Sequence, residues 1–460
     1  MEILLLQQRQ KILILLILLA AATLRITHIG GKSLWFDEAY SVAEAQLPQE
    51  AIWAAEPART DSHPPLYYSA LHYWIAKLGT SEMALRLPSA FISVLSIALI
   101  YALGCRLGAP DVALLAALLL AVSPLDLWYA QEARMYIFLA FIILLAVALQ
   151  LRASWWLAIP LTLVLVTGFY IDYTMLALWL GMSAFWLYYW RVHEHSVEPL
   201  LIWSAASLLA LLLYIPWRAT FLAWLANFDR VTVYLELSKL TGLPALSNWQ
   251  YLLAAVASVV LLLMLMFLLR RALHNEKILP LLTIVVVGGY VLLNFLFIVP
   301  RFYSLKRLLV QAWPAVILFV AWIILQSRRG RHLATMTILA SLIAAVILLV
   351  FVQKDDWRGA VTFINRHATA ADVALLEHPW NQKVTRYYGL KSKLVSLEFL
   401  EDSIAPPKPG NVWYIAERFP GQMGAKSVKE QWLDQNLEAV AASLFTRLEV
   451  SRFTYRSGPK

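Results

Sequence analysis

Two adjacent carboxylates, Asp37 and Glu38, follow the first apolar run of the chain. The rings of Trp35, Phe36 and Tyr40 are typical of a membrane–water interface, so we expect the acidic pair to lie close to the lipid headgroups. Charges are costly to bury there unless a partner or a reaction uses them. One carboxylate could accept a proton as a general base, or the pair could bind a divalent cation. The alternative is an acidic pair that only solvates the loop.

A second polar group comes shortly afterwards, in the sequence DSHPP at positions 61–65. The prolines are expected to end the loop and begin a helix, because proline fixes φ and lacks an N–H donor. Asp61 and His63 would then add an acid and an imidazole to the loop that holds Asp37. The alternative is a rigid helix start without chemistry. Too few ligands are visible to assign a metal site.

A third group, Glu132, Arg134 and Tyr136, lies between two predicted membrane spans and on the predicted side of Asp37. These side chains could contact a substrate. The alternative is a polar loop in which Arg134 pairs with Glu132 or with a lipid.

A fourth group consists of the cations Arg301, Lys306 and Arg307, which flank aromatic residues at the start of a late span. Guanidinium groups match the geometry of phosphate oxygens, so this group suits a phosphate at the headgroup level. The alternative is simple anchoring at the interface.

The composition places these groups on a membrane protein. The 460-residue chain is 61% hydrophobic and only 15% charged, which is too apolar for a soluble domain to cover its surface. Nineteen Trp and twenty Tyr suit aromatic belts at the two interfaces. The net charge of +9 fits loop anchoring and phosphate contact, and we do not expect a nucleic-acid partner. The single Cys105 excludes an intramolecular disulfide.

Repeated apolar runs predict about eleven membrane helices. Their expected ranges are 12–30, 86–106, 111–128, 134–150, 155–171, 174–190, 200–217, 251–269, 278–298, 308–326 and 333–352. The stretch 65–78 is shorter and rich in aromatic residues, so it is predicted to lie in the interface rather than to span. Basic residues are shared evenly between the two sets of loops, so their number does not fix the orientation. One set is mixed with acids, aromatics and prolines in longer segments, as expected of a face that handles anions.

The tail after residue 352 is predicted to be a small α/β domain. Val373–Leu376 and Val412–Ile415 are expected to be buried strands, and Trp357–Arg366 and Glu430–Ala442 to be helices. An odd number of spans would place this domain on the side of Asp37.

The ordered motifs resemble those of a known superfamily. They are Arg25 at the end of the first span, LWFDEA at 34–39, HPPLYY at 63–68, ALRLPSA at 84–90 (which contains Arg86) and QEARMY at 131–136. This order is similar to that of the dolichyl-phosphate-mannose protein mannosyltransferase superfamily. The resemblance is to its bacterial membrane-glycosyltransferase branch, which includes the aminoarabinose transferases that modify lipid A.

The resemblance implies a GT-C fold, a polyprenyl-phosphate monosaccharide donor and inversion at the sugar. It implies that Asp37, with Glu38 beside it, is the catalytic acidic position, and that Arg307, with Arg301 nearby, holds the donor phosphate. The superfamily often has a Tyr-rich turn with a histidine near the fifth and sixth spans, where this chain has Asp172. The aminoarabinose transferases carry Lys before the proline pair, whereas His63 stands here, which argues against their particular substrate.

The resulting hypothesis is an all-α polytopic membrane bundle of the GT-C type, residues 1–352, with a catalytic first outer loop at 31–85. Residues 353–460 would form the small α/β domain on the extracytoplasmic side of a bacterial inner membrane. The acceptor would be a protein, a lipid or a glycan, no cofactor is assigned, and a divalent metal stays open. The rival hypotheses are a transporter or flippase of lipid-linked sugars, which would act without chemistry, and a non-catalytic member whose tail binds a partner.

Overall fold

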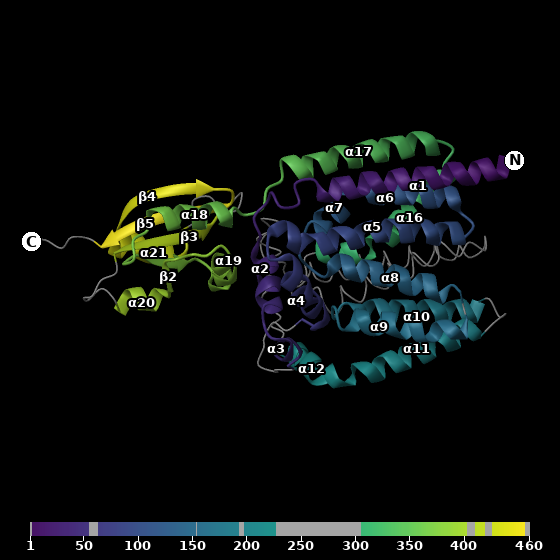
Figure 1. Ribbon diagram of the computed structural model, residues 1–460, viewed down its shortest axis with the longest axis horizontal. Coiled ribbons are helices and arrows are strands. Elements are labelled where there is room, and N and C mark those ends of the chain that lie inside the picture. Colours follow the sequence, from purple (N-terminus) through teal and green to yellow (C-terminus); the bar gives the residue numbers. More distant parts are fainter. Residues whose placement is uncertain are drawn as a thin grey trace, which may run out of the picture. The chain divides into compact units, whose positions relative to one another are not determined.

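The computed structural model describes residues 2–54, 63–152, 154–192, 197–226, 305–402, 410–418 and 426–455. Contacts divide the chain into two compact units, and Figure 1 labels most of their helices and strands. The helical unit comprises Met1–Thr27, Pro48–Tyr73 and Arg86–Leu349. The sheet unit comprises His28–Leu47, Trp74–Leu85 and Val350–Lys460. In addition to the tail, the sheet unit therefore contains two segments of the predicted first outer loop.

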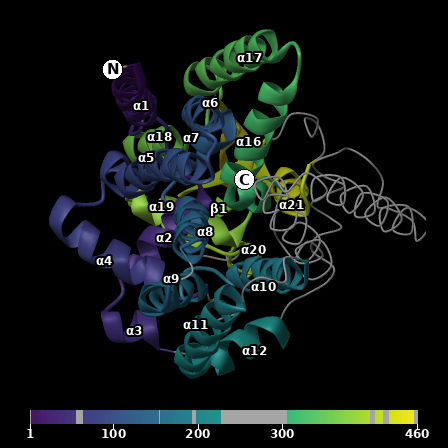
Figure 2. The same ribbon diagram turned by 90° about the vertical axis from the view of Figure 1, so that its right-hand side faces the viewer.

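The helical unit is a bundle, and Figure 2 views it along its helices with α8 in the interior. Its α-helices, including two that begin or end in the other unit, are α1 (Glu2–Ile26), α3 (Gln49–Trp53), α4 (Leu66–Leu78), α5 (Glu82–Arg106), α6 (Pro110–Ala121), α7 (Pro124–Ala130), α8 (Tyr136–Gln150), α9 (Ala158–Phe169), α10 (Met175–Val192), α11 (Glu198–Tyr214), α12 (Arg218–Ala226), α16 (Leu305–Gln326) and α17 (Gly330–Val350). Short 3₁₀ turns, η1 (Trp155–Leu157) and η2 (Ile215–Trp217), precede α9 and α12. The helix α16 packs against both α6 and α8.

Several predicted spans coincide with long apolar helices. Within the described residues, four helical stretches are long and apolar enough to cross a membrane: Glu82–Arg106, Glu198–Trp224, Leu309–Gln326 and Gly330–Val350. The helices α8, α9 and α10 overlap three further predicted spans, and the apolar helical stretches there are shorter than these four: Tyr136–Gln150, Trp155–Phe169 and Leu178–Leu187. The predicted spans 251–269 and 278–298 lie outside the described residues. A mostly helical fold is therefore confirmed, while the count of eleven spans stays a prediction.

One predicted span, 111–128, is not a continuous helix. It consists of α6 and α7, which are bent by 58° relative to each other. The break lies at Ser123, whose side chain caps α7 by accepting a hydrogen bond from the backbone N–H of Asp126. Pro124 has no N–H to continue the helical ladder, so the chain starts a new helix there.

The stretch predicted to lie in the interface forms the 13-residue helix α4. A membrane span needs about 20 residues, so α4 is too short to cross a typical bilayer by itself. Its position in the interface stays a prediction.

The sheet unit contains a five-stranded mixed sheet with the strand order β2-β1-β3-β5-β4. Its strands are β1 (Val373–Leu376), β2 (Lys393–Val395), β3 (Asn411–Glu417), β4 (Leu437–Phe445) and β5 (Leu448–Tyr455). Its helices are α2 (Phe36–Ala45), α18 (Trp357–His367), α19 (Gln382–Tyr387), α20 (Leu397–Asp402) and α21 (Val428–Asn436), with the 3₁₀ turn η4 (Pro379–Asn381) before α19. The strands β1, β2 and β3 are parallel, and β5 pairs antiparallel with β3 and β4. The predicted strands and the helix after residue 356 are confirmed.

The helix predicted at Glu430–Ala442 is wrong in its second half. The helix α21 ends at Asn436, and Leu437–Phe445 forms the edge strand β4. This strand pairs with β5 across a tight turn that ends at Arg447, and a pairing of this kind cannot be read from local periodicity.

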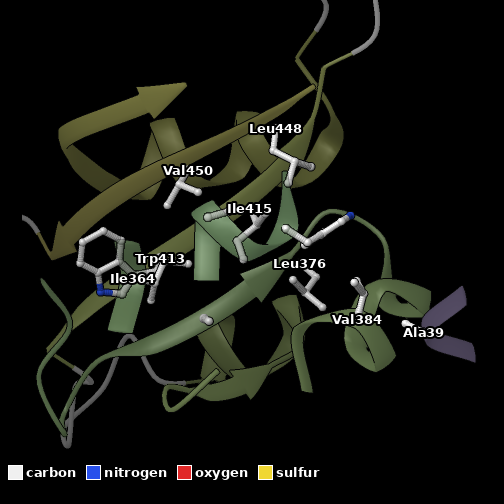
Figure 3. Close-up of a cluster of buried hydrophobic side chains, with 11 residues drawn as sticks. Ala39, Ile364, Leu376, Val384, Trp413, Ile415, Leu448 and Val450 are labelled. Atoms are coloured by element: carbon white, nitrogen blue, oxygen red, sulfur yellow. The ribbon is translucent and has the colours of Figure 1, made fainter. Parts of the chain in front are cut away.

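Side chains alternate between the two faces of the sheet, as strand geometry requires. One face carries Trp413 and Ile415 of β3 and packs on α18 and α19. The opposite face carries Val412 and Tyr414 and packs on α20 and α21. The first cluster also contains Ala39 of α2, so α2 is part of the core of this unit (Figure 3).

Candidate active site

A cationic cluster forms in the helical unit from three of the predicted groups. His63 lies just before α4, and its Nε2 is 3.4 Å from Nη2 of Arg134. The turn between α7 and α8 holds Arg134, which is 3% exposed and whose carbonyl accepts a 3.5 Å hydrogen bond from Ser89. The helix start after His63 is fixed because the N–H of Leu66 donates to the carbonyl of Tyr170.

Two guanidinium groups approach the ring of Tyr136. The Cζ atoms of Arg134 and Arg307 are 5.6 and 5.8 Å from the centre of this ring. These contacts are cation–π interactions, which help to hold the two guanidinium groups in place. Arg307 sits in the first turn of α16, where the positive end of the helix dipole adds to the local potential. Residues far apart in sequence therefore bring two cations to one aromatic ring.

His63 is neutral at this position. Burial, with the charges of Arg134 and Arg307, holds the pKa of His63 well below its usual range. A guanidinium can only donate, so Nε2 of His63 accepts and the ring proton is assigned to Nδ1. Within the described residues, this buried Nδ1 has no hydrogen-bond partner. The imidazole is thus a hydrogen-bond donor beside two cations, a set of groups suited to an anion.

The predicted acidic pair lies in the sheet unit, in the first turn of α2. Asp37 is 8% exposed, and its backbone carbonyl accepts a hydrogen bond from the hydroxyl of Ser41. Glu38 is fully buried, and its Oε2 is 2.9 Å from Nζ of Lys354. The carboxylate of Glu38 is therefore engaged in a buried ion pair, which its position in the sequence did not indicate.

Arg25 was also predicted to be a site residue. Arg25 is fully buried and ties helices together, donating to the carboxylate of Asp126 (2.6 Å), the hydroxyl of Ser93 (2.7 Å) and the carbonyl of Ala121 (3.0 Å). This geometry is that of a packing contact inside the bundle. Sequence reasoning missed its partners, although an acid inside a predicted span was a visible signal for one.

Two further predicted residues, Arg86 in α5 and Glu132 in the turn before α8, are each 1% exposed. Asp61 and Arg301 lie outside the described residues. Lys306 is in the first turn of α16, and its side chain is outside the described part of the chain.

The Tyr-rich turn with Asp172 connects to the helix that carries Arg307. Oδ1 of Asp172 accepts hydrogen bonds from the backbone N–H (2.8 Å) and hydroxyl (2.7 Å) of Thr174. The same hydroxyl oxygen is 2.8 Å from Oε1 of Gln311, one helical turn after Arg307. The turn thus helps to hold α16 in place.

Across the described ranges, no group of three or more His, Cys, Asp or Glu is arranged to hold a metal ion. His63, the described member of the predicted acid and imidazole pair, belongs to no such group within these ranges.

Comparisons with known proteins agree with the motifs. Residues 62–219 match the family model described as dolichyl-phosphate-mannose-protein mannosyltransferase. A comparison of the sequence with curated proteins finds no match. The resemblance to this superfamily is confirmed by the family match and by the structural similarities that follow.

Several solved structures have a similar fold. ArnT from Cupriavidus metallidurans, bound to undecaprenyl phosphate, has a TM-score of 0.57 and 13% identity, covering 97% of this chain and 99% of that one. The oligosaccharyltransferase of Archaeoglobus fulgidus, tethered to an acceptor peptide, has a TM-score of 0.56 and 10% identity, covering 89% of this chain and 69% of that one. The archaeal enzyme has also been solved with an inhibitory peptide and a dolichol-phosphate, at a TM-score of 0.53 and 10% identity, covering 89% of this chain and 69% of that one.

Proposed function

We propose that the protein is an inverting membrane glycosyltransferase that moves a monosaccharide from a polyprenyl-phosphate donor to an extracytoplasmic acceptor. The observation that carries this proposal is the approach of both Arg134 and Arg307 to the ring of Tyr136, with the neutral His63 beside Arg134. Such a set of donors suits a phosphate whose negative charge increases during the reaction. The similar ArnT and archaeal structures hold polyprenyl phosphates, which supports this class of ligand.

The proposed reaction is a single displacement. The acceptor oxygen or nitrogen forms a bond to C1 of the sugar while the bond from C1 to the phosphate oxygen breaks. Asp37 takes the proton from the acceptor, and the polyprenyl phosphate leaves with one additional negative charge. Arg134 and Arg307 stabilise this charge electrostatically, and Nδ1–H of His63 donates a hydrogen bond to the phosphate. One base and a stabilised leaving group suffice for inversion, so no second carboxylate is needed as a nucleophile.

The test begins with the donor. The full-length protein in bilayer vesicles is incubated with a panel of synthetic undecaprenyl-phosphate hexoses and pentoses and with cell-envelope extract. Mass spectrometry then detects which donor is consumed and which acceptor gains a sugar. A protein that moves these lipids across the bilayer without consuming any of them would be a flippase, and the proposal would be wrong.

The base is tested with Asp37→Asn. This change keeps the size and polarity of the side chain but removes its ability to take a proton. We expect transfer to fall by about 10²-fold or more, because a positioned base contributes about 10²–10⁴-fold. Transfer within a few-fold of wild type would exclude Asp37 as the base.

A further inference from the structure

Glu38 is held by a buried ion pair to the chain segment that enters the C-terminal sheet. Oε2 of Glu38 is 2.9 Å from Nζ of Lys354, and the two side chains are 0% and 5% exposed. The same oxygen lies 3.4 Å from the backbone nitrogen of Trp35, at the start of α2. Removing one partner of a buried ion pair strongly destabilises the folded protein, because the other charge is then buried without a partner. The pair therefore fixes the N-terminal turn of α2, which also carries Asp37.

A second attachment is hydrophobic. Ala39 is 1% exposed and belongs to the core cluster that includes Trp357 of α18, Val384 of α19 and Ile415 of β3. Figure 3 shows Ala39 beside Val384. The residue after Glu38 is thus packed into the core of the sheet unit.

A third attachment holds the other end of α2. Nζ of Lys383, on α19, is 3.0 Å from Oε1 of Glu44. The same Nζ lies 3.5 Å from the ring centre of Tyr40. Two lysines from the C-terminal part of the chain therefore hold α2. Lys354 contacts Glu38 near its start, and Lys383 contacts Glu44 near its end.

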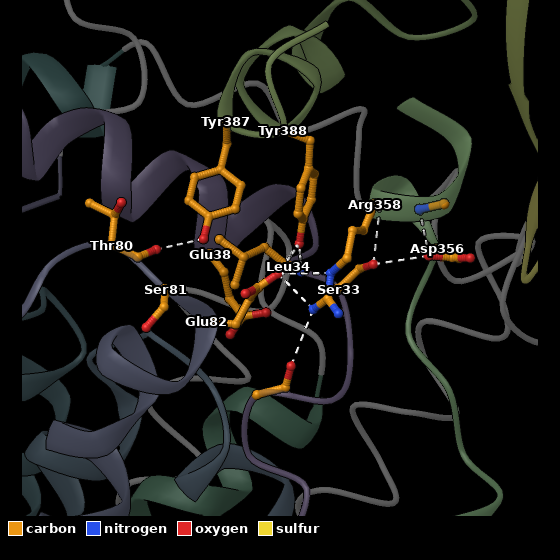
Figure 4. Close-up of polar contacts among 12 residues, drawn as sticks. Ser33, Leu34, Glu38, Thr80, Ser81, Glu82, Asp356, Arg358, Tyr387 and Tyr388 are labelled. Atoms are coloured by element: carbon orange, nitrogen blue, oxygen red, sulfur yellow. Dashed lines mark hydrogen bonds and ion pairs between the residues drawn. The ribbon is translucent and has the colours of Figure 1, made fainter. Parts of the chain in front are cut away.

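The segment before α2 is held as well (Figure 4). The backbone N–H of Leu34 donates to the hydroxyl of Tyr388 at 2.7 Å, and this hydroxyl donates to Glu82 at 3.0 Å. Ser33 accepts a 3.2 Å hydrogen bond from the backbone N–H of Arg358 and donates to Asp356 at 3.2 Å. These contacts fix the path of the chain into the helix.

From these contacts we infer that Glu38 is a positioning residue, which together with Lys354 fixes the helix that presents Asp37 to the acceptor. This inference rests on the proposed function, in which Asp37 is the base. The carboxylate of Glu38 is committed to a buried ammonium group, so taking a proton would break the ion pair. The C-terminal sheet is, on this account, the support of the catalytic base.

The experiment uses full-length variants and the undecaprenyl-phosphate sugar that the wild-type protein consumes. Glu38→Gln and Lys354→Met each leave one unpaired group and allow α2 to shift. We expect each to lower kcat by about 10- to 100-fold while the KM for the donor changes less than about threefold, because a displacement of about 1 Å can cost 10²-fold. The double variant Glu38→Gln/Lys354→Met removes both charges and should recover kcat to within about tenfold of wild type. The matched control is Lys426→Met, which breaks an exposed ion pair elsewhere in the same unit and should leave kcat unchanged.

Two results would overturn the inference. A double variant as inactive as Asp37→Asn would show that Glu38 itself takes part in the chemistry. Single variants with wild-type kcat per folded molecule would show that the pair only stabilises the protein. Hydrogen exchange of residues 36–45 is measured in parallel and should increase in Lys354→Met but not in Lys426→Met. If Asp37→Asn stayed active, the base assignment would fail, while hydrogen exchange would still test the attachment of α2.

Discussion

At the scale of single residues, the sequence predicted which side chains could hold a phosphate but not how they combine. His63, Arg134 and Arg307 belonged to separate motifs, and the structure brings them together around Tyr136. The motifs indicated candidate phosphate-binding residues, because they combine aromatic and basic side chains where a membrane–water interface is expected. The neutral state of His63 could not be predicted, because it depends on burial and on Arg307, which lies on a distant helix.

Arg307 is expected to act mainly on turnover. If its contact with the phosphate strengthens as the leaving group gains charge, its removal slows the reaction rather than only weakening donor binding. We expect Arg307→Ala to lower kcat/KM for the donor by about 10- to 1000-fold, or about 1.4–4 kcal/mol. Arg307→Lys should recover part of this, because a point charge lacks the planar fork. Steady-state kinetics at saturating acceptor measures the effect, with the exposed Arg328→Ala, beyond the other end of α16, as the matched control.

His63 is expected to act as a neutral donor. His63→Ala should lower kcat/KM for the donor by about tenfold, and His63→Asn should restore part of this, because the Asn amide N–H can replace Nδ1–H. The folded-state pKa of His63 is depressed below its usual value near 6.5, so the ring stays neutral as the pH falls through 6.5. The donor kcat/KM should therefore show no inflection near pH 6.5 that depends on this residue. An inflection there that disappears in His63→Asn would show that the charged imidazole is the active form.

At the scale of elements, long apolar runs predicted the helices well, because an 18-residue apolar stretch has few other uses in a protein. The bend at Ser123 was missed although Pro124 was a visible signal for it. The strand β4 was missed for a different reason. In its hairpin turn, Arg447 has a φ of 57°. Gly or Asn usually occupies a position with positive φ in such a turn, and either residue would have indicated the hairpin in the sequence. Without this signal, the stretch after Asn436 looked like a continuing helix.

Asp372 makes the stability of the sheet depend on pH. It accepts hydrogen bonds from the backbone N–H of Asn411 (2.9 Å), the hydroxyl of Thr369 (2.7 Å) and the indole of Trp413 (2.8 Å). Burial alone would raise the pKa of Asp372, but these hydrogen bonds outweigh it and lower the pKa to about 2. The unfolded chain binds a proton more readily, so this stabilisation is fully present above pH of about 4 and is lost as the pH falls toward 2.

The variant Asp372→Asn should therefore weaken the sheet most at neutral pH, by about 2 kcal/mol. Hydrogen exchange of β1 and β3 in the full-length protein measures this, comparing variant and wild type at each pH. The difference should shrink as the pH falls below 4. The matched control is Asp434→Asn, which removes a carboxylate from a more exposed ion pair. A difference that stays constant down to pH 2.5 would contradict the role of the ionised carboxylate.

At the scale of the whole molecule, the sequence separated a membrane bundle from an α/β tail but did not predict the composition of the second unit. The segments His28–Leu47 and Trp74–Leu85 join Val350–Lys460 through contacts between residues hundreds of positions apart. The pair Glu38 and Lys354 illustrates the difficulty, because neither residue has a local signal for the other. The periodicity of apolar residues shows which face of a helix or strand is buried, but it does not show which distant segment packs on that face.

The sidedness of the molecule can be tested without the full number of spans. The helix α17 (Gly330–Val350) is long and apolar enough to cross a membrane and connects Ser327 to the sheet unit. If α17 crosses, Ser327 and the sheet unit lie on opposite sides, whatever the arrangement of the earlier helices. Val428 is 78% exposed on the sheet unit and is a suitable position for a label.

In a Cys105→Ser background, Val428→Cys should react with an impermeant thiol reagent added to intact spheroplasts. Ser327→Cys should react only after the membrane is permeabilised, which is also the control for intrinsic reactivity. This pattern would place the sheet unit, and with it Asp37, on the extracytoplasmic face, where a polyprenyl-linked sugar would meet an envelope acceptor. Labelling of Ser327→Cys alone would reverse the orientation and make the acceptor cytoplasmic. Equal labelling of both positions in intact spheroplasts would show that α17 does not cross the membrane.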